Sequence, residues 1–297
     1  MTAAIRTENL VKRYGRTPVL DGLCMDVPEG AIYALVGPNG AGKTTTIHTL
    51  LNLIAPAAGR SEVLGVDSRK LGAPDFARIG YVSENQKLPA WMRVSEFLAY
   101  LKPFYPTWDD ALAVDLLRQF NLPADRKLKE LSRGMRMKAA LASALAFHPK
   151  VLVLDEPFSG LDALVRDDFI QGMLERAEET TIFISSHDLA EIESFASHIG
   201  YLEGGKLLFS DEMATLTARF REVEVTLETE AELPAPWPAN WMTAERAGSV
   251  VRFVETAYEP EATEARVRAA FGAVRGVEVR PMALRAIFVA LARQGRR

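Results

Sequence analysis

A glycine-rich loop between an apolar run and a helix-like run constrains the fold of this chain more than any other feature. Its eight residues follow the pattern G-x-x-x-x-G-K-[ST] and are Gly37, Pro38, Asn39, Gly40, Ala41, Gly42, Lys43 and Thr44. Such glycines let backbone N–H groups surround phosphate oxygens, while the lysine adds a positive charge and the threonine hydroxyl suits Mg²⁺. Because residues 31–36 read as a strand and 45–51 as a helix, the phosphates would meet the positive end of a helix dipole. The pattern predicts a chain that binds a nucleoside triphosphate.

The composition is that of an ordinary globular protein. The chain has 297 residues, of which 48 % are hydrophobic and 25 % charged, enough for one large domain or two smaller ones. The net charge of −4 does not favour nucleic-acid binding, which usually shows as a basic excess. Cys24 is the only cysteine, which excludes an internal disulfide and a cysteine metal cluster. No apolar run approaches the roughly 20 residues that span a bilayer, so we expect a cytoplasmic chain that does not cross a membrane alone.

The first two thirds of the chain read as an α/β domain. Between the loop and about residue 185, three apolar runs are typical of buried parallel strands, at residues 79–82, 151–154 and 181–185. Residues 94–147 read as helices, and residues 162–177 as a crossover helix between the last two strands. These patterns predict a phosphate-loop α/β domain over residues 1–218, with a helical insertion at about 90–148.

Composition shifts near Phe220, which indicates a second unit. Residues 222–228 alternate as in a strand, and residues 233–241 are rich in proline and tryptophan, which is typical of a loop. A final helix follows Pro281, with an apolar stripe at helical spacing formed by Leu284, Ile287, Phe288 and Leu291. We expect a small α+β unit over residues 219–297, with an accessory or regulatory role.

Two carboxylates follow the second of the three apolar runs. Asp155 stands at the predicted carboxyl end of that strand, where it could hold Mg²⁺ opposite Thr44. Glu156 could then polarise an attacking water as a general base. A lone acidic pair after a strand is usually a solvated strand end, but a phosphate loop in the same chain favours catalysis. His187 ends the next strand at the same sheet edge and could donate to the γ-phosphate.

A second helix start follows at Leu131-Ser132-Arg133-Gly134-Met135. By itself this segment, the signature turn, would be an ordinary helix cap. Ser132 and the Gly134 backbone nevertheless form a second anion-binding helix end, about ninety residues from the loop. Two chains arranged head to tail could each supply this second end to the other's nucleotide.

The order of these motifs resembles that of the ATP-binding cassette (ABC) ATPases. The phosphate loop, L-S-x-G, the hydrophobic run with D-E, S-G-L-D and S-S-H follow one another over about residues 3–215. The resemblance implies a role for each motif: Tyr14 stacks on adenine, Gly37 to Thr45 wrap the phosphates, Ser132 and Gly134 contact the partner's γ-phosphate, Asp162 crosses the dimer interface, and His187 senses the γ-phosphate.

The last fifteen or so residues resemble the tail of exporter-type ATPase subunits that are encoded separately from their membrane partners. This resemblance implies ATP hydrolysis coupled to export through separate transmembrane permease subunits. It also implies a second ABC ATPase subunit, in a homodimer or heterodimer that closes on ATP, with no nucleic acid involved. The chain would lie on the inner face of the cell membrane.

Three residues at two places in the chain depart from the family pattern. Glu84 stands at the end of the run at 79–82, where the family usually has Gln. A carboxylate there could ligate Mg²⁺ or hold the attacking water, and Gln86, two residues on, is the alternative γ-phosphate sensor. In the signature turn, Arg133 replaces Gly and Met135 replaces Gln.

Two other classes of function compete with the exporter subunit. A soluble ABC-type ATPase acting in DNA, ribosome or cofactor-assembly work is the main alternative. Its usual marks are a long heptad insertion, a CxxC hook or two cassettes, and this sequence has none of them. A GTPase or small-molecule kinase would not need the signature turn, and no N-K-x-D motif is present.

Aromatic residues gather directly after Glu84. Six of the chain's 25 aromatics lie within 18 residues and form the aromatic segment: Trp91, Phe97, Tyr100, Phe104, Tyr105 and Trp108. They could be the core of the helical insertion, or some could form an exposed groove for a helix of a membrane subunit.

Overall fold

The computed structural model describes residues 2–177, 179–229 and 233–294, and it divides the chain into two compact units. The first unit ends at Ser210 and the second begins at Asp211, whereas the sequence placed the boundary at 218/219. The division falls inside a strand, β10 (Lys206–Glu212), so helix α7 (Met213–Arg219) belongs to the second unit. Of the described residues, no helix is long and apolar enough to cross a membrane.

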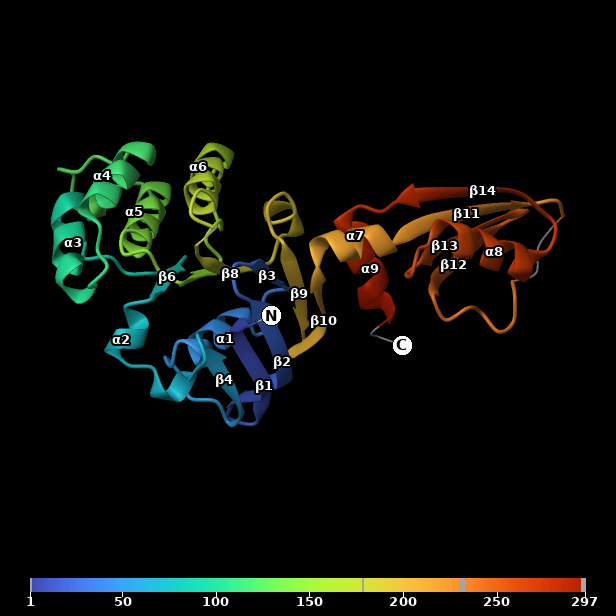
Figure 1. Ribbon diagram of the computed structural model, residues 1–297, viewed down its shortest axis with the longest axis horizontal. Coiled ribbons are helices and arrows are strands. Elements are labelled where there is room, and N and C mark those ends of the chain that lie inside the picture. Colours follow the sequence, from blue (N-terminus) through green and yellow to red (C-terminus); the bar gives the residue numbers. More distant parts are fainter. Residues whose placement is uncertain (1, 178, 230–232, 295–297) are drawn as a thin grey trace. The chain divides into compact units, whose positions relative to one another are not determined.

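A six-stranded sheet forms the centre of the first unit (Figure 1). Its strand order is β10-β9-β3-β8-β7-β6, and the neighbouring strands from β9 to β6 are parallel. Besides β10 its strands are β3 (Ile32–Val36), β6 (Ile79–Ser83), β7 (Val151–Asp155), β8 (Thr181–Ser186) and β9 (His198–Glu203). Parallel strands are covered on both faces, which explains why every residue of β7 and β8 is buried. The three apolar runs are therefore confirmed as strands.

An antiparallel sheet of order β2-β1-β4-β5 packs beside the central sheet. Its strands are β1 (Ala3–Tyr14), β2 (Thr17–Pro28), β4 (Ala58–Val63) and β5 (Val66–Asp67). Helix α1 (Lys43–Leu50) follows the phosphate loop, and the short helices η1 (Ser68–Lys70) and α2 (Ala73–Phe76) follow β5. One apolar core joins both sheets to α1, and its buried members include Ile5, Leu23, Leu35, Ile47 and Val153.

The predicted helical insertion lies between β6 and β7. It contains α3 (Val94–Leu101), η2 (Lys102–Phe104), α4 (Asp110–Gln119), η3 (Leu128–Glu130) and α5 (Arg133–Leu145). Nearly all of α5 is buried, because its alanines and leucines let neighbouring helices approach closely. The crossover helix is α6 (Ala163–Leu174), and η4 (Leu189–Glu191) follows β8. The α/β cassette fold with a helical insertion is thereby confirmed.

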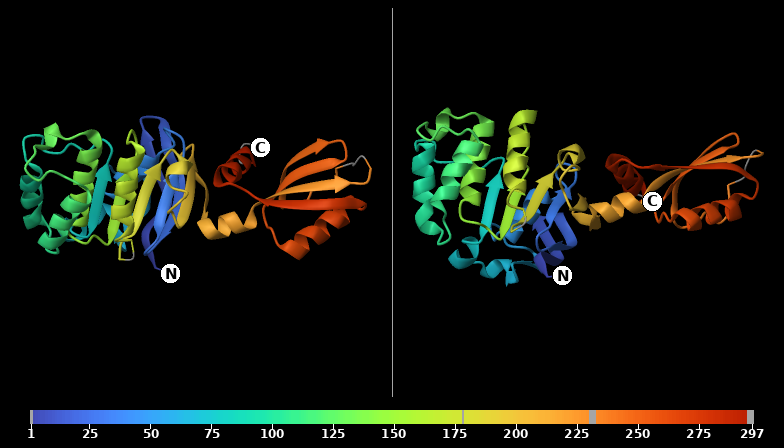
Figure 2. Two further views of the ribbon diagram at one scale, coloured as in Figure 1. Left: turned by 90° about the horizontal axis from the view of Figure 1, so that it is seen from above. Right: turned by 45° about the horizontal axis from the view of Figure 1, so that its top comes forward.

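The second unit is a sheet with its own core. After α7, its elements are β11 (Arg221–Leu227), β12 (Trp241–Ala247), β13 (Val250–Glu255), α8 (Pro260–Phe271), β14 (Val274–Pro281) and α9 (Leu284–Gln294). The strand order is β12-β13-β11-β14, and α8 runs along one face of this sheet (Figure 2). The core packs Val223, Val225, Trp241, Phe253 and Val267 together, so the predicted strand at 222–228 buries its valines.

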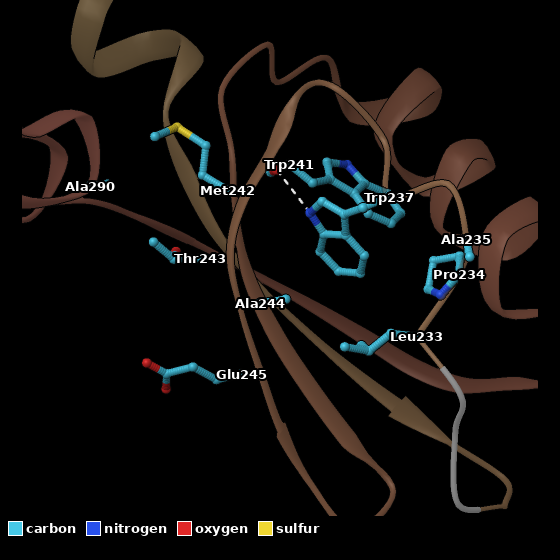
Figure 3. A pocket seen from close by; sticks show the side chains of 10 residues that line it. All are labelled: Leu233, Pro234, Ala235, Trp237, Trp241, Met242, Thr243, Ala244, Glu245 and Ala290. Carbon is cyan, nitrogen blue, oxygen red and sulfur yellow. Dashed lines mark hydrogen bonds between the residues drawn. The ribbon is translucent and has the colours of Figure 1, made fainter. Parts of the chain in front are cut away.

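A pocket of about 770 Å³ opens in the second unit, beside β12 (Figure 3). Leu233, Trp237, Met242 and Glu245 are among the residues that line it. The Trp237 Nε1–H donates a 2.8 Å hydrogen bond to the carbonyl oxygen of Trp241. This bond holds the proline- and tryptophan-rich loop against the strand.

Candidate active site

The phosphate loop connects β3 to the first turn of α1. Gly42 is the N-cap of α1, with a φ of 111°. A Cβ atom at this position would lie 2.8 Å from Leu20 Cδ2 and 2.9 Å from the Val19 carbonyl oxygen. Only glycine therefore fits, both because of the backbone angle and because of the close packing. The tip of the loop, residues 38–40, is exposed, so its backbone is accessible to a ligand.

Lys43 carries a buried positive charge at the start of α1, with only 5 % of its surface exposed. Its Nζ donates to the carbonyl oxygens of Gly37 at 2.7 Å and Pro38 at 3.3 Å. The same Nζ lies 3.0 Å from Glu156 Oε1. A buried charge is tolerated when it is paired and hydrogen-bonded, and these three acceptors hold the ammonium group at the helix N-terminus.

Asp155, at the end of β7, accepts two hydroxyl hydrogen bonds on one oxygen. Thr44 Oγ1 lies 3.1 Å and Ser185 Oγ 2.7 Å from Asp155 Oδ1. Burial raises the pKa of Asp155 above its usual value, and the two hydrogen bonds act in the opposite direction. Carboxylate and hydroxyl oxygens are ligands that suit Mg²⁺. Among the described residues no cluster of three or more His, Cys, Asp or Glu side chains could hold a metal. Mg²⁺ in proteins usually keeps waters and substrate phosphates as ligands beside one or two carboxylates.

Glu156 lies between two basic side chains. Its Oε1 faces Lys43, and its Oε2 lies 2.8 Å from His187 Nδ1. The hydrogen bond to Glu156 and the charge of that carboxylate raise the pKa of His187 above its ordinary value. Glu156 itself has a φ of 50°, a left-handed conformation that is costly for a residue with a side chain and is often found at functional sites.

Ser185 is a member of this site whose role the sequence did not reveal. Besides its bond to Asp155, its Oγ accepts the Glu156 N–H at 3.0 Å. The two carboxylates therefore depend on one hydroxyl of the neighbouring strand. The signal lies in the parallel register, which pairs Asp155 with Ser185, but the sequence alone does not give that register.

The signature turn forms a separate group at the start of α5. Ser132 is exposed and caps the helix, with its Oγ accepting the Met135 N–H at 3.2 Å. Gly134 packs so closely on α6 that a Cβ atom would lie 2.7 Å from Val165 Cγ1. Asp162 caps α6 by accepting the Val165 N–H at 3.0 Å. These contacts join Gly134 and Asp162 through Val165.

The remaining predicted site residues lie apart from the Asp155 carboxylate. Glu84 donates its backbone N–H to the Asp155 carbonyl oxygen at 3.0 Å, but its carboxylate contacts Arg133 and Ser159. Gln86 turns back on its own loop, where its Oε1 lies 3.4 Å from the Ser83 nitrogen. Tyr14 is 54 % exposed at the end of β1, and Lys12 Nζ lies 5.3 Å from the centre of its ring.

Comparison with known proteins identifies this arrangement. Residues 20–159 match the model of a family described as ABC transporter. The bacitracin transport ATP-binding protein BcrA of Bacillus licheniformis is 36 % identical over 212 residues, which cover 70 % of this chain and 69 % of BcrA. The daunorubicin resistance ATP-binding protein DrrA2 of Streptomyces coeruleorubidus is 34 % identical over 278 residues, or 90 % of this chain and 82 % of DrrA2.

Solved structures and other relatives agree with this family. A structure described as the ATP-binding subunit of an ABC transporter superposes with a TM-score of 0.66 at 26 % identity, covering 73 % of this chain and 92 % of the other. Relatives described as import proteins also occur, such as a probable sulfate/thiosulfate import ATP-binding protein of Chlorella vulgaris, 34 % identical over 69 % of this chain and 89 % of its own length. The cassette alone therefore does not give the direction of transport.

Proposed function

The chain belongs to the ATP-hydrolysing subunits of ABC transporters, and from that premise we propose that it powers an exporter by closing on ATP against a second ABC ATPase subunit. The observation that carries the proposal is that the chain has two phosphate-seeking helix ends whose side chains make different contacts. The α1 end holds Lys43, Glu156 and His187 in one network. The α5 end is capped by the exposed Ser132 and has contacts of its own. A second chain placed head to tail would bring the two ends to one nucleotide.

Each side chain near α1 then has a part in hydrolysis. The loop N–H groups and Lys43 bind the phosphates, with Tyr14 stacking on the base. Thr44 and Asp155 would hold Mg²⁺, which would neutralise charge that develops on the phosphate oxygens. Glu156 orients the attacking water and accepts its proton. Because phosphate oxygens compete with Glu156 for the Lys43 ammonium group, nucleotide binding frees the carboxylate for the water, while His187 keeps it oriented.

The aromatic segment supports contact with separate transmembrane permease subunits. Trp91, Tyr100 and Phe104 are 69 %, 55 % and 61 % exposed, whereas Phe97 is buried. Tyr105 stacks on Phe147 with ring centroids 3.9 Å apart. The segment therefore serves both the core and the surface, and its exposed rings suit the apolar side of a docking helix. Docking of this kind would hold the chain at the inner, cytoplasmic face of the membrane.

The direction of transport rests on the second unit. The alignment with the daunorubicin resistance relative extends over 278 residues and therefore into that unit, whereas the import relative above covers only 69 % of the chain. The bacitracin transport relative, like the import relative, covers about 70 % of the chain, so the support for export comes from the longer alignment with the daunorubicin resistance relative, with the second unit as an accessory or regulatory part. The exported substrate would contact the membrane subunits.

A mixing experiment tests the shared site. Lys43→Ala removes the phosphate contact of one chain, and Ser132→Ala removes the signature contact, so each variant alone should hydrolyse ATP slowly. In a mixed dimer, the loop of the Ser132→Ala chain meets the signature turn of the Lys43→Ala chain, which restores one complete site. If the two sites act independently, an equal mixture should regain about a quarter of the wild-type rate, because about half of randomly formed dimers are mixed and each has one of two sites. A mixture no faster than its components, although mixed dimers are shown to form, would count against the proposal.

A further inference from the structure

Two of the residues that depart from the family pattern, Glu84 and Arg133, contact each other. The Arg133 guanidinium donates through Nη2 to Glu84 Oε1. Ser159 Oγ donates to the same oxygen at 2.9 Å. Three segments far apart in the sequence meet at this carboxylate: the loop after β6, the signature turn, and the loop that follows β7.

Electrostatics gives Arg133 a reason to need this acid. Arg133 is the first residue of α5, and a positive charge at a helix N-terminus is unfavourable. The first turn of α5 contains no acidic residue of its own, so the neutralising carboxylate comes from Glu84. The guanidinium also lies against the backbone of Gly160, where a Cβ atom would be 2.8 Å from Arg133 Nη1. Charge and packing together fix the direction of the side chain.

Backbone hydrogen bonds connect this cluster to the catalytic carboxylate. The Glu84 N–H binds the carbonyl oxygen of Asp155, the residue before Glu156, at 3.0 Å. The Ser159 N–H lies 3.3 Å from the Glu156 carbonyl oxygen. On the other side, Arg133 stands between Ser132 and Gly134. The cluster thus connects the backbone around Glu156 to the signature turn of the same chain.

We propose that Arg133 and Glu84 act as one positioning pair, which fixes the signature turn relative to the backbone that carries Glu156. Glu84 is then a partner of Arg133 and not a ligand of Mg²⁺, and neither residue touches the reacting atoms. The inference rests on the proposed function, because it needs the signature turn to take part in hydrolysis. Replacing either Glu84 or Arg133 alone by an uncharged residue leaves the remaining charged side chain without its partner. Replacing both residues together removes this unpaired charge.

The test is a double-substitution cycle on the full chain. Glu84→Gln and Arg133→Gly should each lower ATP turnover at least tenfold, while the Kd for ATP and the Mg²⁺ concentration for half-maximal rate stay within about twofold. The double variant carries the residues that the family usually has at these two positions, and its turnover should return to within about threefold of wild type. Arg133→Gln, combined with Glu84→Gln, separates loss of charge from the flexibility of glycine. Asp115→Asn removes an exposed ion pair with Arg118 on α4 and is the matched control.

Two results would overturn the pairing. If the fold-losses in ATP turnover of the single variants multiply in both double variants, Arg133 and Glu84 act independently. If Glu84→Gln raises the required Mg²⁺ at least tenfold, Glu84 is a metal ligand. Ser132→Ala, measured in parallel, distinguishes this failure from failure of the proposed function. If Ser132→Ala leaves turnover unchanged, the signature turn has no role in hydrolysis and the proposed function fails. If Ser132→Ala lowers turnover but the effects of the Arg133 and Glu84 substitutions are independent, only the positioning pair is overturned.

Discussion

At the scale of single residues, the site depends on how one carboxylate is shared. Glu156 faces Lys43 with one carboxylate oxygen and His187 with the other. Both side chains therefore compete with the attacking water for the same carboxylate. Its backbone is fixed by Ser185. The arrangement separates two tasks. Nucleotide binding depends on Lys43 and the phosphate loop, whereas removal of a proton from the attacking water depends on Glu156.

Glu156→Gln separates these tasks. The amide keeps the shape of the side chain but is a poor proton acceptor, so turnover should fall at least a hundredfold, about 2.7 kcal/mol in the barrier. ATP should still bind, and the ATP-bound dimer should persist on gel filtration. The exposed Glu29→Gln is the control. Wild-type turnover in Glu156→Gln would remove this carboxylate from the mechanism.

The His187–Glu156 pair should also make folding stability depend on pH. The pKa of His187 is raised in the folded chain above its ordinary value of 6.5. A group of this kind stabilises the fold fully below the unfolded pKa, and the effect is lost as the pH rises through the folded pKa. Wild type should therefore exceed His187→Asn in unfolding free energy more at pH 6 than at pH 9. Urea denaturation at both pH values measures the difference, which should lose its pH dependence in a Glu156→Gln background. A difference that grows with pH would contradict the assignment.

The sequence was sufficient to place some of these residues at one sheet edge and not others. The phosphate loop, Asp155, Glu156 and His187 follow strands that apolar runs reveal, and parallel strands deliver their ends to one edge. Ser185 and the Arg133–Glu84 contact depend on the strand register and on side-chain direction between segments about 30 to 50 residues apart, which neither spacing nor composition encodes. The predicted metal role of Glu84 came from its position alone.

At the scale of elements, the helical insertion has an uneven surface. Periodicity predicted its helices but left open which aromatics are core, because a ring fits both a core and a docking surface. The structure buries Phe97 and exposes Tyr100 and Phe104, whose rings form an edge-to-face pair at 5.7 Å. The exposed pair begins at the last turn of α3, where it adds little to the core.

Removing this pair should uncouple the cassette and leave it folded. Tyr100→Ala with Phe104→Ala should change the unfolding free energy by no more than about 0.5 kcal/mol per site, as for other exposed positions. Stimulation of ATPase activity by the membrane subunit should drop at least fivefold, while basal ATP binding stays unchanged. Leu53→Ala, at another exposed apolar residue, is the control. Full stimulation of the double variant would place the membrane contact elsewhere.

At the scale of the whole molecule, the chain joins two units with separate cores. The residues of the Lys43–Glu156 network and the signature turn all lie before Ser210, in the first unit. The core of the second unit consists of residues from Val223 onward. The change in composition near Phe220 pointed to this division, although the structure assigns α7 to the second unit.

Truncation after Phe220 should accordingly spare nucleotide binding. The shortened chain keeps β10, an edge strand of the central sheet, and should bind ATP with a Kd within about threefold of the full chain. Calorimetric titration of both chains measures this. A loss of binding in a truncated chain that is still folded by circular dichroism would mean that the second unit supports the site.

The central claim is that two chains complete each nucleotide site, and the dependence of ATPase rate on protein concentration tests it most directly. The account predicts that activity per chain rises with concentration and reaches a plateau when dimers saturate. A membrane subunit that holds two cassettes together raises their effective concentration and should remove that dependence. Activity per chain that stays constant down to concentrations at which the protein is shown to be a monomer would contradict the account, because Ser132 and Gly134 would then never meet a partner's nucleotide.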